Sequence, residues 1–104
     1  MQKEINNLLK LAEEAPSGEP ILKAAVEVTR MLIEKNISYG DSALHPAGIF
    51  SKGSAVEQLS ARLDDKLNRI KNNQSYANEG MKDAVDDTIG YLILLKIAIE
   101  NIEK

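Results

Sequence analysis

The sequence predicts a small all-α protein, a bundle of three to four helices that is completed by oligomerisation. Apolar residues recur at steps of three and four over most of the chain, which is the spacing of one helix face. Leu, Ile, Ala and Val supply most of the apolar content, and aromatic residues make up only 4% of the chain, as suits a helical core. At 104 residues we expect one domain, residues 1–104, with a modest core that association would enlarge.

Composition argues against several functional classes. The net charge of −3 disfavours general nucleic-acid binding, which needs a basic face. The absence of cysteine excludes disulfides and thiolate chemistry and is compatible with the cytoplasm. Met1–Glu4 leads into a polar helix rather than a signal peptide, and the longest apolar run, Ile89–Ile99, is too short to cross a bilayer. We therefore expect a cytoplasmic protein with no membrane partner.

The first third of the chain is expected to form two amphipathic helices. Within residues 2–15 the apolar side chains follow helical spacing: Ile5, Leu8, Leu9 and Ala12. Two prolines, Pro16 and Pro20, end this helix and begin the next. Residues 20–36 continue the pattern with Leu22, Ala25, Val26, Thr29, Leu32 and Ile33. Residues 1–15 are thus a helical arm, which packs either on its own chain or on a neighbouring subunit.

Residues 37–53 form a candidate ligand loop. Regular structure is ruled out by turn residues: Gly40, Pro46, Gly48 and Gly53. The loop is nevertheless too apolar for a plain linker, since it contains Tyr39, Leu44, Ile49 and Phe50. Loops of this kind are usually folded lids or binding loops. Ser54 and Glu57 then match a capping box, so a third helix should begin near Ser54.

Residues 54–72 and 79–103 are expected to form the third and fourth helices, joined by a turn at residues 72–75. The third helix carries an apolar seam: Val56, Leu59, Leu63, Leu67 and Ile70. Roughly opposite lies a polar face: Gln58, Arg62, Asp65 and Arg69. From Ile89 to Ile99 the fourth helix is apolar almost all round. We therefore expect it to be buried between the subunits of a homodimer or homotetramer.

A set of short motifs carries a resemblance to a known family. The motifs are Lys35-Asn36, Tyr39-Gly40-Asp41-Ser42, His45-Pro46, Ile49-Phe50-Ser51-Lys52, Glu57-Gln58-Leu59, Arg62–Ile70 and Asp86–Leu92. Over roughly residues 30–100 the pattern resembles the phage-associated nucleotide-modification-associated domain family. The resemblance implies bacterial viruses, nucleotides and the host cytoplasm during infection, but no single reaction.

The stretch Asp83–Leu95 is also similar to the last helix of the all-α nucleoside-triphosphate pyrophosphohydrolases, the MazG and dimeric dUTPase-like group. Those enzymes bind Mg²⁺ with acidic pairs and add a Glu-x-x-Glu pair on the preceding helix. Here Ser60 stands three residues after Glu57, and Asp64 and Asp65 are adjacent, so they point about 100° apart on a helix. The carboxylate cage is incomplete, and we expect no metal ligands and no cofactor; Mg²⁺ enters only if the enzyme alternative holds.

Candidate ligand contacts lie in the loop and on the third helix. On the helix, a cationic stripe able to hold phosphates consists of Arg62, Lys66 and Arg69. The alternative is that these cations pair with acidic neighbours on the same helix. In the loop, rings that can stack on a base and groups that can donate to a phosphate are Tyr39, Asp41, Ser42, His45, Phe50, Ser51 and Lys52. The alternative is ordinary turn chemistry, with Phe50 pinning the loop to the bundle.

The expected function is non-catalytic binding of a small nucleotide, with no catalytic residue. In the phage setting that the resemblance implies, the protein would be a sponge. It would sequester a host cyclic-nucleotide immune signal, such as a cyclic dinucleotide, in an anti-CBASS type of counter-defence. The alternative is an Mg²⁺-dependent, MazG-like nucleoside-triphosphate pyrophosphohydrolase acting in phage nucleotide metabolism or base modification. A third hypothesis is a structural interaction module without a small ligand.

Overall fold

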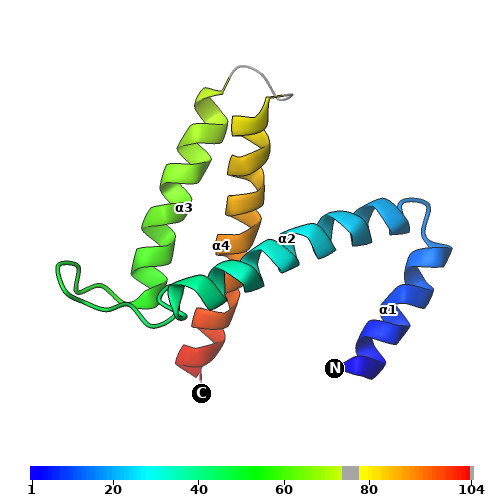
Figure 1. Cartoon of the computed structure of the whole chain (residues 1–104), viewed down its shortest axis with the longest axis horizontal. Coiled ribbons are helices and arrows are strands. Elements are labelled where there is room, and N and C mark those ends of the chain that lie inside the picture. The colour runs from blue at the N-terminus through cyan, green and yellow to red at the C-terminus, as the bar shows by residue number, and fades with distance from the viewer. Residues whose placement is uncertain (74–77, 104) are drawn as a thin grey trace.

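The structure, a computed structural model, contains four helices and no strand in the parts of the chain that it describes, residues 1–73 and 78–103. In chain order the helices are α1 (Gln2–Glu14), α2 (Gly18–Tyr39), α3 (Ala55–Asn72) and α4 (Glu79–Glu103) (Figure 1). Helices α3 and α4 form an antiparallel hairpin, α2 crosses α4, and α1 turns back from the far end of α2. The predicted all-α bundle is confirmed; the turn expected at residues 72–75 lies partly outside the described residues.

Helix α2 is longer at both ends than the sequence pattern predicted. At its start, a Cβ on Gly18 would lie 1.9 Å from the carbonyl oxygen of Ala12, so only glycine fits where α1 folds against α2. Pro20 stands in the first turn, where a missing N–H costs no intrahelical hydrogen bond. At its end, Gly40 adopts the left-handed conformation (φ 60°, ψ 36°), which glycine tolerates without a Cβ clash. Tyr39 is therefore the last residue of a helix rather than part of a loop.

The start of α3 follows the predicted capping box. The hydroxyl of Ser54 accepts a hydrogen bond from the backbone N–H of Glu57 at 3.2 Å. In return, the Ser54 N–H donates to the Glu57 carboxylate at 3.1 Å. The hydrogen bond from the Ser54 backbone lowers the pKa of Glu57 below its ordinary value. Two otherwise unsatisfied N–H groups at the helix start are thus satisfied, and the boundary between loop and helix is set locally.

The core lies between α3 and α4 and extends to α2 and the loop. Its centre is formed by Leu59, Leu94 and Ala98, around which pack Leu32, Ala43, Leu44, Ala55, Val56, Tyr91 and Leu95. Leu32 brings α2 to the hairpin, while Ala43 and Leu44 anchor the start of the loop. The alternative role considered for Phe50, pinning the loop to the bundle, is wrong, because this side chain is 99% exposed. The reason is geometric: the loop beyond Leu44 extends away from the helices (Figure 1).

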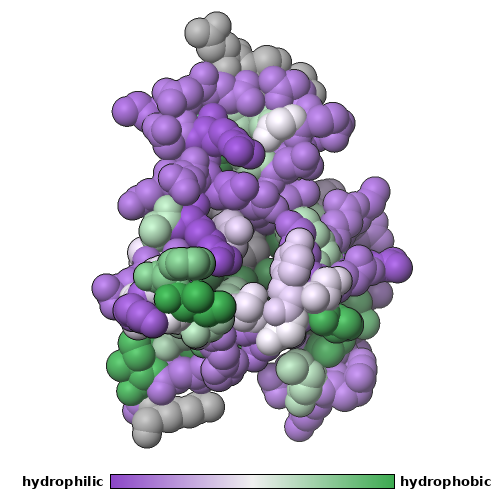
Figure 2. Space-filling view, turned by 60° about the vertical axis from the view of Figure 1, so that its left-hand side comes forward, coloured by the Kyte–Doolittle hydropathy of each residue, from purple (hydrophilic) through white to green (hydrophobic). Residues whose placement is uncertain are grey.

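The molecule is open for its size. Its accessible surface is 8127 Å², whereas a compact monomer of this mass exposes roughly 5,800 Å². Its radius of gyration is 15.9 Å, against about 13 Å for a compact domain of this length. Among the described helices, α1 contacts only α2. Apolar side chains consequently remain at the surface, mostly in the half away from the α3–α4 turn (Figure 2).

The apolar stretch of α4 is covered on one side in the single chain. Gly90, Leu94 and Ala98 are buried, whereas Ile89, Leu92 and Ile99 are exposed. The exposed side of α4 is available for contact with another subunit. Burial of this helix between subunits, expected from the sequence, stays a prediction. Within the described ranges, no helix is both long and apolar enough to cross a membrane.

The capping box can be tested by Ser54→Ala, which removes the acceptor for the Glu57 N–H. We expect the free energy of unfolding to fall by about 0.5–2 kcal/mol, the usual contribution of an N-cap side chain. Urea denaturation followed by circular dichroism measures it. Ser60→Ala is the matched control, because Ser60 is exposed in the interior of the same helix. Equal stabilities of the two variants would contradict a stabilising cap.

Candidate functional site

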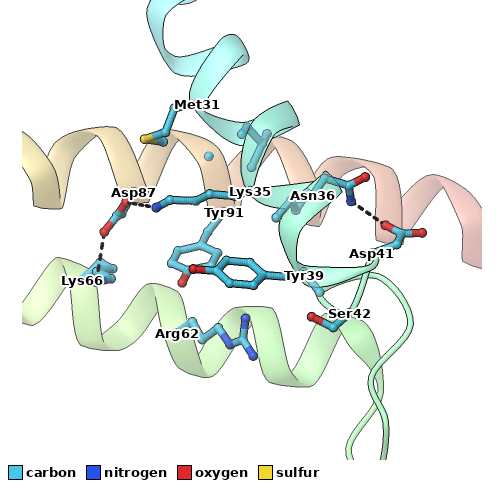
Figure 3. A pocket seen from close by; sticks show the side chains of 14 residues that line it. Met31, Lys35, Asn36, Tyr39, Asp41, Ser42, Arg62, Lys66, Asp87 and Tyr91 are labelled. Carbon is cyan, nitrogen blue, oxygen red and sulfur yellow. Dashed lines mark hydrogen bonds and ion pairs between the residues drawn. The ribbon is translucent and has the colours of Figure 1, made fainter.

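A pocket of about 280 Å³ lies where α2, the loop that follows it, α3 and α4 meet (Figure 3). Its floor is apolar and is formed by Met31, Leu32, Ala43, Gly90 and Leu94. The remaining lining is aromatic, charged, amide- or hydroxyl-bearing, and comes from three helices and the loop. The pocket therefore exists only in the folded arrangement of these four segments.

Two tyrosine rings and one arginine form an aromatic and cationic wall. Tyr39 ends α2 and Tyr91 lies on α4, and both side chains line the pocket (Figure 3). The guanidinium carbon of Arg62 on α3 is 6.0 Å from the centre of the Tyr91 ring, at the outer limit of a cation–π contact. Tyr39 and Arg62 are exposed, so the wall is open to an entering ligand.

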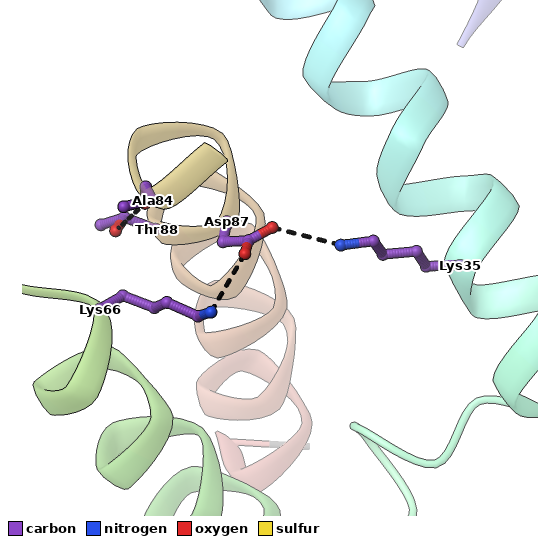
Figure 4. A network of polar contacts seen from close by, with 5 residues as sticks. All are labelled: Lys35, Lys66, Ala84, Asp87 and Thr88. Atoms are coloured by element: carbon purple, nitrogen blue, oxygen red, sulfur yellow. Dashed lines mark hydrogen bonds and ion pairs between the residues drawn. The ribbon is translucent and has the colours of Figure 1, made fainter. Parts of the chain in front are cut away.

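A carboxylate held by two lysines forms the opposite end of the pocket. Asp87 on α4 accepts a hydrogen bond from Lys35 on α2 at 3.2 Å and pairs with Lys66 on α3 at 3.1 Å (Figure 4). The side chains of Asp87 and Lys66 are only 21% and 19% exposed. Burial by itself raises the pKa of Asp87, but the hydrogen bonds and charges of Lys66 and Lys35 outweigh it, and the pKa lies below its ordinary value. Asp87 is therefore ionised at neutral pH.

The rim of the pocket is organised by the turn at the end of α2. Asp41 follows Gly40 and also has a positive φ, 64°. This conformation is supported by hydrogen bonds from the Asn36 side chain to the Asp41 carboxylate, 2.7 Å, and from the Asp41 N–H to the Asn36 carbonyl, 3.2 Å. Asparagine and aspartate tolerate such turns because their side chains bond locally. The turn places Asp41 and Ser42 at the pocket mouth.

The structure brings together half of the predicted binding residues. Five of them line this pocket: Tyr39, Asp41, Ser42, Arg62 and Lys66. The other five do not: His45, Phe50, Ser51, Lys52 and Arg69. Of these, His45 lies 3.3 Å from the Asp41 carboxylate on its outer side, and Lys52 donates to the carbonyl of Gly48 within the loop.

Arg69 and the loop tip stay out of the pocket for simple geometric reasons. Arg69 is on the same face of α3 as Arg62, but seven residues along a helix are about 10 Å. The predicted cationic stripe is thus real as a helix face, yet only its first two members reach the pocket. Residues 49–52 are carried away from the site by the protruding loop (Figure 1).

Four polar or aromatic lining residues were not among the predicted contacts: Lys35, Asn36, Asp87 and Tyr91. A signal for them was present, because Lys35 and Tyr39 are one helical turn apart, as are Asp87 and Tyr91. Each pair therefore shares one face of its helix. What the spacing could not supply was which faces of α2 and α4 meet.

The acidic residues weighed as metal ligands do not gather around one point. Among residues 1–73 and 78–103, no three His, Cys, Asp or Glu side chains are placed together as metal ligands. Glu57 is engaged in the helix cap and Asp87 between two lysines. Of the two carboxylates that line the pocket, Asp41 and Asp87, the second is thus already paired with two protein cations.

A scan against protein-family models, a search of curated proteins and a search of solved structures each returned no match. The chemistry of the pocket therefore carries the functional argument. Its three cations, Lys35, Arg62 and Lys66, suit an anion, and its two tyrosine rings suit a flat aromatic group.

Asp87→Asn tests the network that joins the three helices. At pH 7 we expect the free energy of unfolding to fall by about 1–3 kcal/mol, since the largely buried Lys66 ammonium loses its charged partner. Because the pKa of Asp87 is lowered by folding, its contribution is complete above its ordinary value of 3.8 and is lost as pH falls below it. The difference in unfolding free energy between wild type and variant should therefore become smaller below about pH 4. Urea denaturation from pH 3 to 7 measures this difference.

The matched control for that series is Asp83→Asn, which removes the same charge from an exposed position one turn earlier on α4. The role assigned to Asp87 would be contradicted if the loss of unfolding free energy in Asp87→Asn did not depend on pH. It would also be contradicted if Asp83→Asn lost as much.

Proposed function

We propose that this pocket binds a small nucleotide and does not transform it. The observation that carries the proposal is the common wall of Tyr39, Tyr91 and Arg62. Aromatic rings stack on nucleobases of any kind, and stacking contributes about 1–3 kcal/mol per base. The Arg62 guanidinium, which lies over the Tyr91 ring, can form two parallel hydrogen bonds with a phosphate. The pairing of a stacking surface with a phosphate donor matches the two ends of a nucleotide.

The two lysines add a second anion-binding element. Lys35 and Lys66 are held in place by Asp87, so little side-chain entropy remains to be lost when an anion arrives. Two lysines around one carboxylate leave a net positive charge at that end of the pocket. A phosphate group can therefore be placed between Arg62 and Lys66, one turn apart on α3.

The pocket volume limits the ligand. Ligand pockets usually span about 300–1,000 Å³, and this one holds about 280 Å³. One chain thus has room for roughly one nucleotide unit. A cyclic dinucleotide would be shared by the equivalent pockets of two copies, in line with a homodimer or homotetramer. With the family resemblance, this supports a phage sponge that sequesters a host cyclic-nucleotide signal in the bacterial cytoplasm.

Binding is preferred to catalysis because of the state of Asp87. In the pyrophosphohydrolases that its helix resembles, carboxylates on this helix hold Mg²⁺. Here two ammonium groups occupy the carboxylate, and a metal ion would have to displace both. A sponge needs only slow dissociation, which requires neither a base nor a nucleophile. Mg²⁺-dependent hydrolysis of a nucleoside triphosphate remains the second candidate, because the acidic stretch of α4 resembles that group.

Arg62→Ala and Arg69→Ala form a matched pair for the binding proposal. Both remove an exposed arginine from one face of α3, but only Arg62 lines the pocket. We expect Arg62→Ala to lose about 1.5–3 kcal/mol of binding free energy, roughly a tenfold to hundredfold loss of affinity. Arg69→Ala should bind like wild type. Arg62→Lys should recover part of the loss, because an ammonium cannot reproduce the guanidinium fork.

Affinities are measured by calorimetric titration of wild type and each mutant. The titrants are cyclic dinucleotides, cyclic trinucleotides and linear triphosphates. Melting temperatures recorded in parallel separate lost binding from lost folding. If Arg62→Ala binds every nucleotide as wild type does, the pocket is not the site.

Metal dependence separates the two candidate functions. For a sponge, a chelator should leave nucleotide affinity unchanged, and ligand released by heat denaturation should be chemically intact. Asp83→Asn and Asp86→Asn should also bind as wild type. Binding that disappears with EDTA and returns with Mg²⁺ would favour the pyrophosphohydrolase, and Mg²⁺-dependent turnover would establish it. Chromatography of the nucleotides before and after incubation supplies the decisive measurement.

A further inference from the structure

A second concave surface lies between α1 and α2, away from the nucleotide pocket. This α1–α2 groove, with a volume of about 630 Å³, is lined by apolar side chains, among them Leu8 and Leu9 from α1 and Leu22, Val26 and Ile33 from α2. The groove is open, and Val26 on its wall is 57% exposed. None of the other described helices contacts α1, so nothing in the described chain closes the groove.

Helix α2 has apolar side chains on two opposite sides, and one of these sides lines the groove. At 100° per residue, Val26 and Ile33 point away from Met31 and Lys35. The second pair faces the nucleotide pocket and α4, and the first pair faces the groove. One helix thus contributes to two surfaces, of which only one is covered within the chain.

Helix α4 carries an uncovered apolar stripe. Its members are spaced at four, three and seven residues along one face: Val85, Ile89, Leu92 and Ile99. All four are at least 40% exposed, and Leu92 is 51% exposed. The opposite face of the same helix contains Leu94 and Ala98, which are buried in the core. This α4 stripe is convex and helical, and the α1–α2 groove is concave and bounded by two helices.

The excess surface of the chain has the size of a subunit interface. The accessible surface of 8127 Å² exceeds that of a compact monomer of this mass by about 2,300 Å². Obligate interfaces bury about 1,000–2,500 Å² on each partner. The chain therefore has enough uncovered surface to form an obligate interface with a partner.

We propose that the α1–α2 groove takes the α4 stripe of a second copy of this chain, and that the exchange is reciprocal in a two-fold dimer. Reciprocal contact covers both surfaces on both copies, as a two-fold interface requires. Groove against groove would leave both stripes exposed, and stripe against stripe would leave both grooves open. Helix α1 is then a clasp on the partner, which accounts for its extension from the body of its own chain (Figure 1).

Each of the two surfaces carries one ion pair, and the charges are compatible with this contact. Arg30 and Glu34 line the groove and pair with each other at 3.0 Å. On α4, Lys96 lies within the stripe and pairs with Glu100. Each surface thus presents one cation and one anion, one turn apart, so that Glu34 of one copy can meet Lys96 of the other. Opposite charges across a contact set its orientation more than its affinity.

Two substitutions on the proposed contact, with one control, test the assembly. Wild type should sediment at twice the chain mass of 11.4 kDa. Val26→Asp and Leu92→Asp should weaken self-association by roughly a hundredfold, because each places a charge in an apolar contact. Their helical content should persist, since both side chains are exposed in the single chain. Asn101→Asp, exposed on α4 off the stripe, should remain dimeric.

Cross-linking identifies the partner surface even if an Asp variant unfolds. The chain contains no cysteine, so each introduced thiol is unique. Val26→Cys and Leu92→Cys chains, co-expressed with tags of different size and treated with a short bismaleimide, should form the mixed dimer in preference to either homodimer. Cross-linking of Val26→Cys with itself, of Leu92→Cys with itself, or a monomeric wild type at micromolar concentration would overturn the proposal.

Discussion

The contact on which the rest of this structure depends is the pair of lysines around Asp87. Helix α2 has few contacts with the α3–α4 hairpin, and this ionic junction is a place where side chains of all three helices meet. Its carboxylate is largely desolvated, which by itself disfavours the charge, and two ammonium groups compensate for that cost. Removing either cation leaves a poorly compensated charge, so the junction constrains the angle at which α2 crosses α4.

That crossing creates the pocket. It brings Tyr39, at the end of α2, and Tyr91, on α4, into the lining of one pocket, where Arg62 from α3 lies over the Tyr91 ring. The same crossing lets Leu32 reach the core at Gly90 and Leu94. The polar junction and the apolar core are therefore adjacent parts of one contact, and the pocket is the space that remains between them. A ligand phosphate near Lys66 would interact with the junction that holds the helices together.

Helix α2 also links the two proposals. One of its faces lines the pocket for which nucleotide binding is proposed, and the opposite face lines the α1–α2 groove. A partner seated in the groove would hold α2 from the side on which its own chain leaves it uncovered. Subunit association and nucleotide binding would then favour the same position of α2, which is the physical condition for coupling between two sites.

The sequence by itself determined the local elements of this protein. Helical periodicity predicted four helices, the Ser54–Glu57 box placed the start of α3, and the α3 seam identified Leu59 and Leu63 as core. These features depend on neighbours within a few residues, so local patterns are sufficient. Arg62 and Lys66 were identified as pocket cations for the same reason, as one face of one helix.

Only the tertiary structure decided which faces meet. Tyr91 and Asp87 belong to the site because α4 turns that side toward α2, and Arg69 does not because the pocket ends before reaching it. The apolar side chain of Phe50 suggested that it could pin the loop to the bundle, yet it is exposed to solvent. Contacts between distant segments depend on how helices cross, and crossing is set by a small number of long-range contacts such as Lys35 with Asp87. Spacing along one helix holds no information about them.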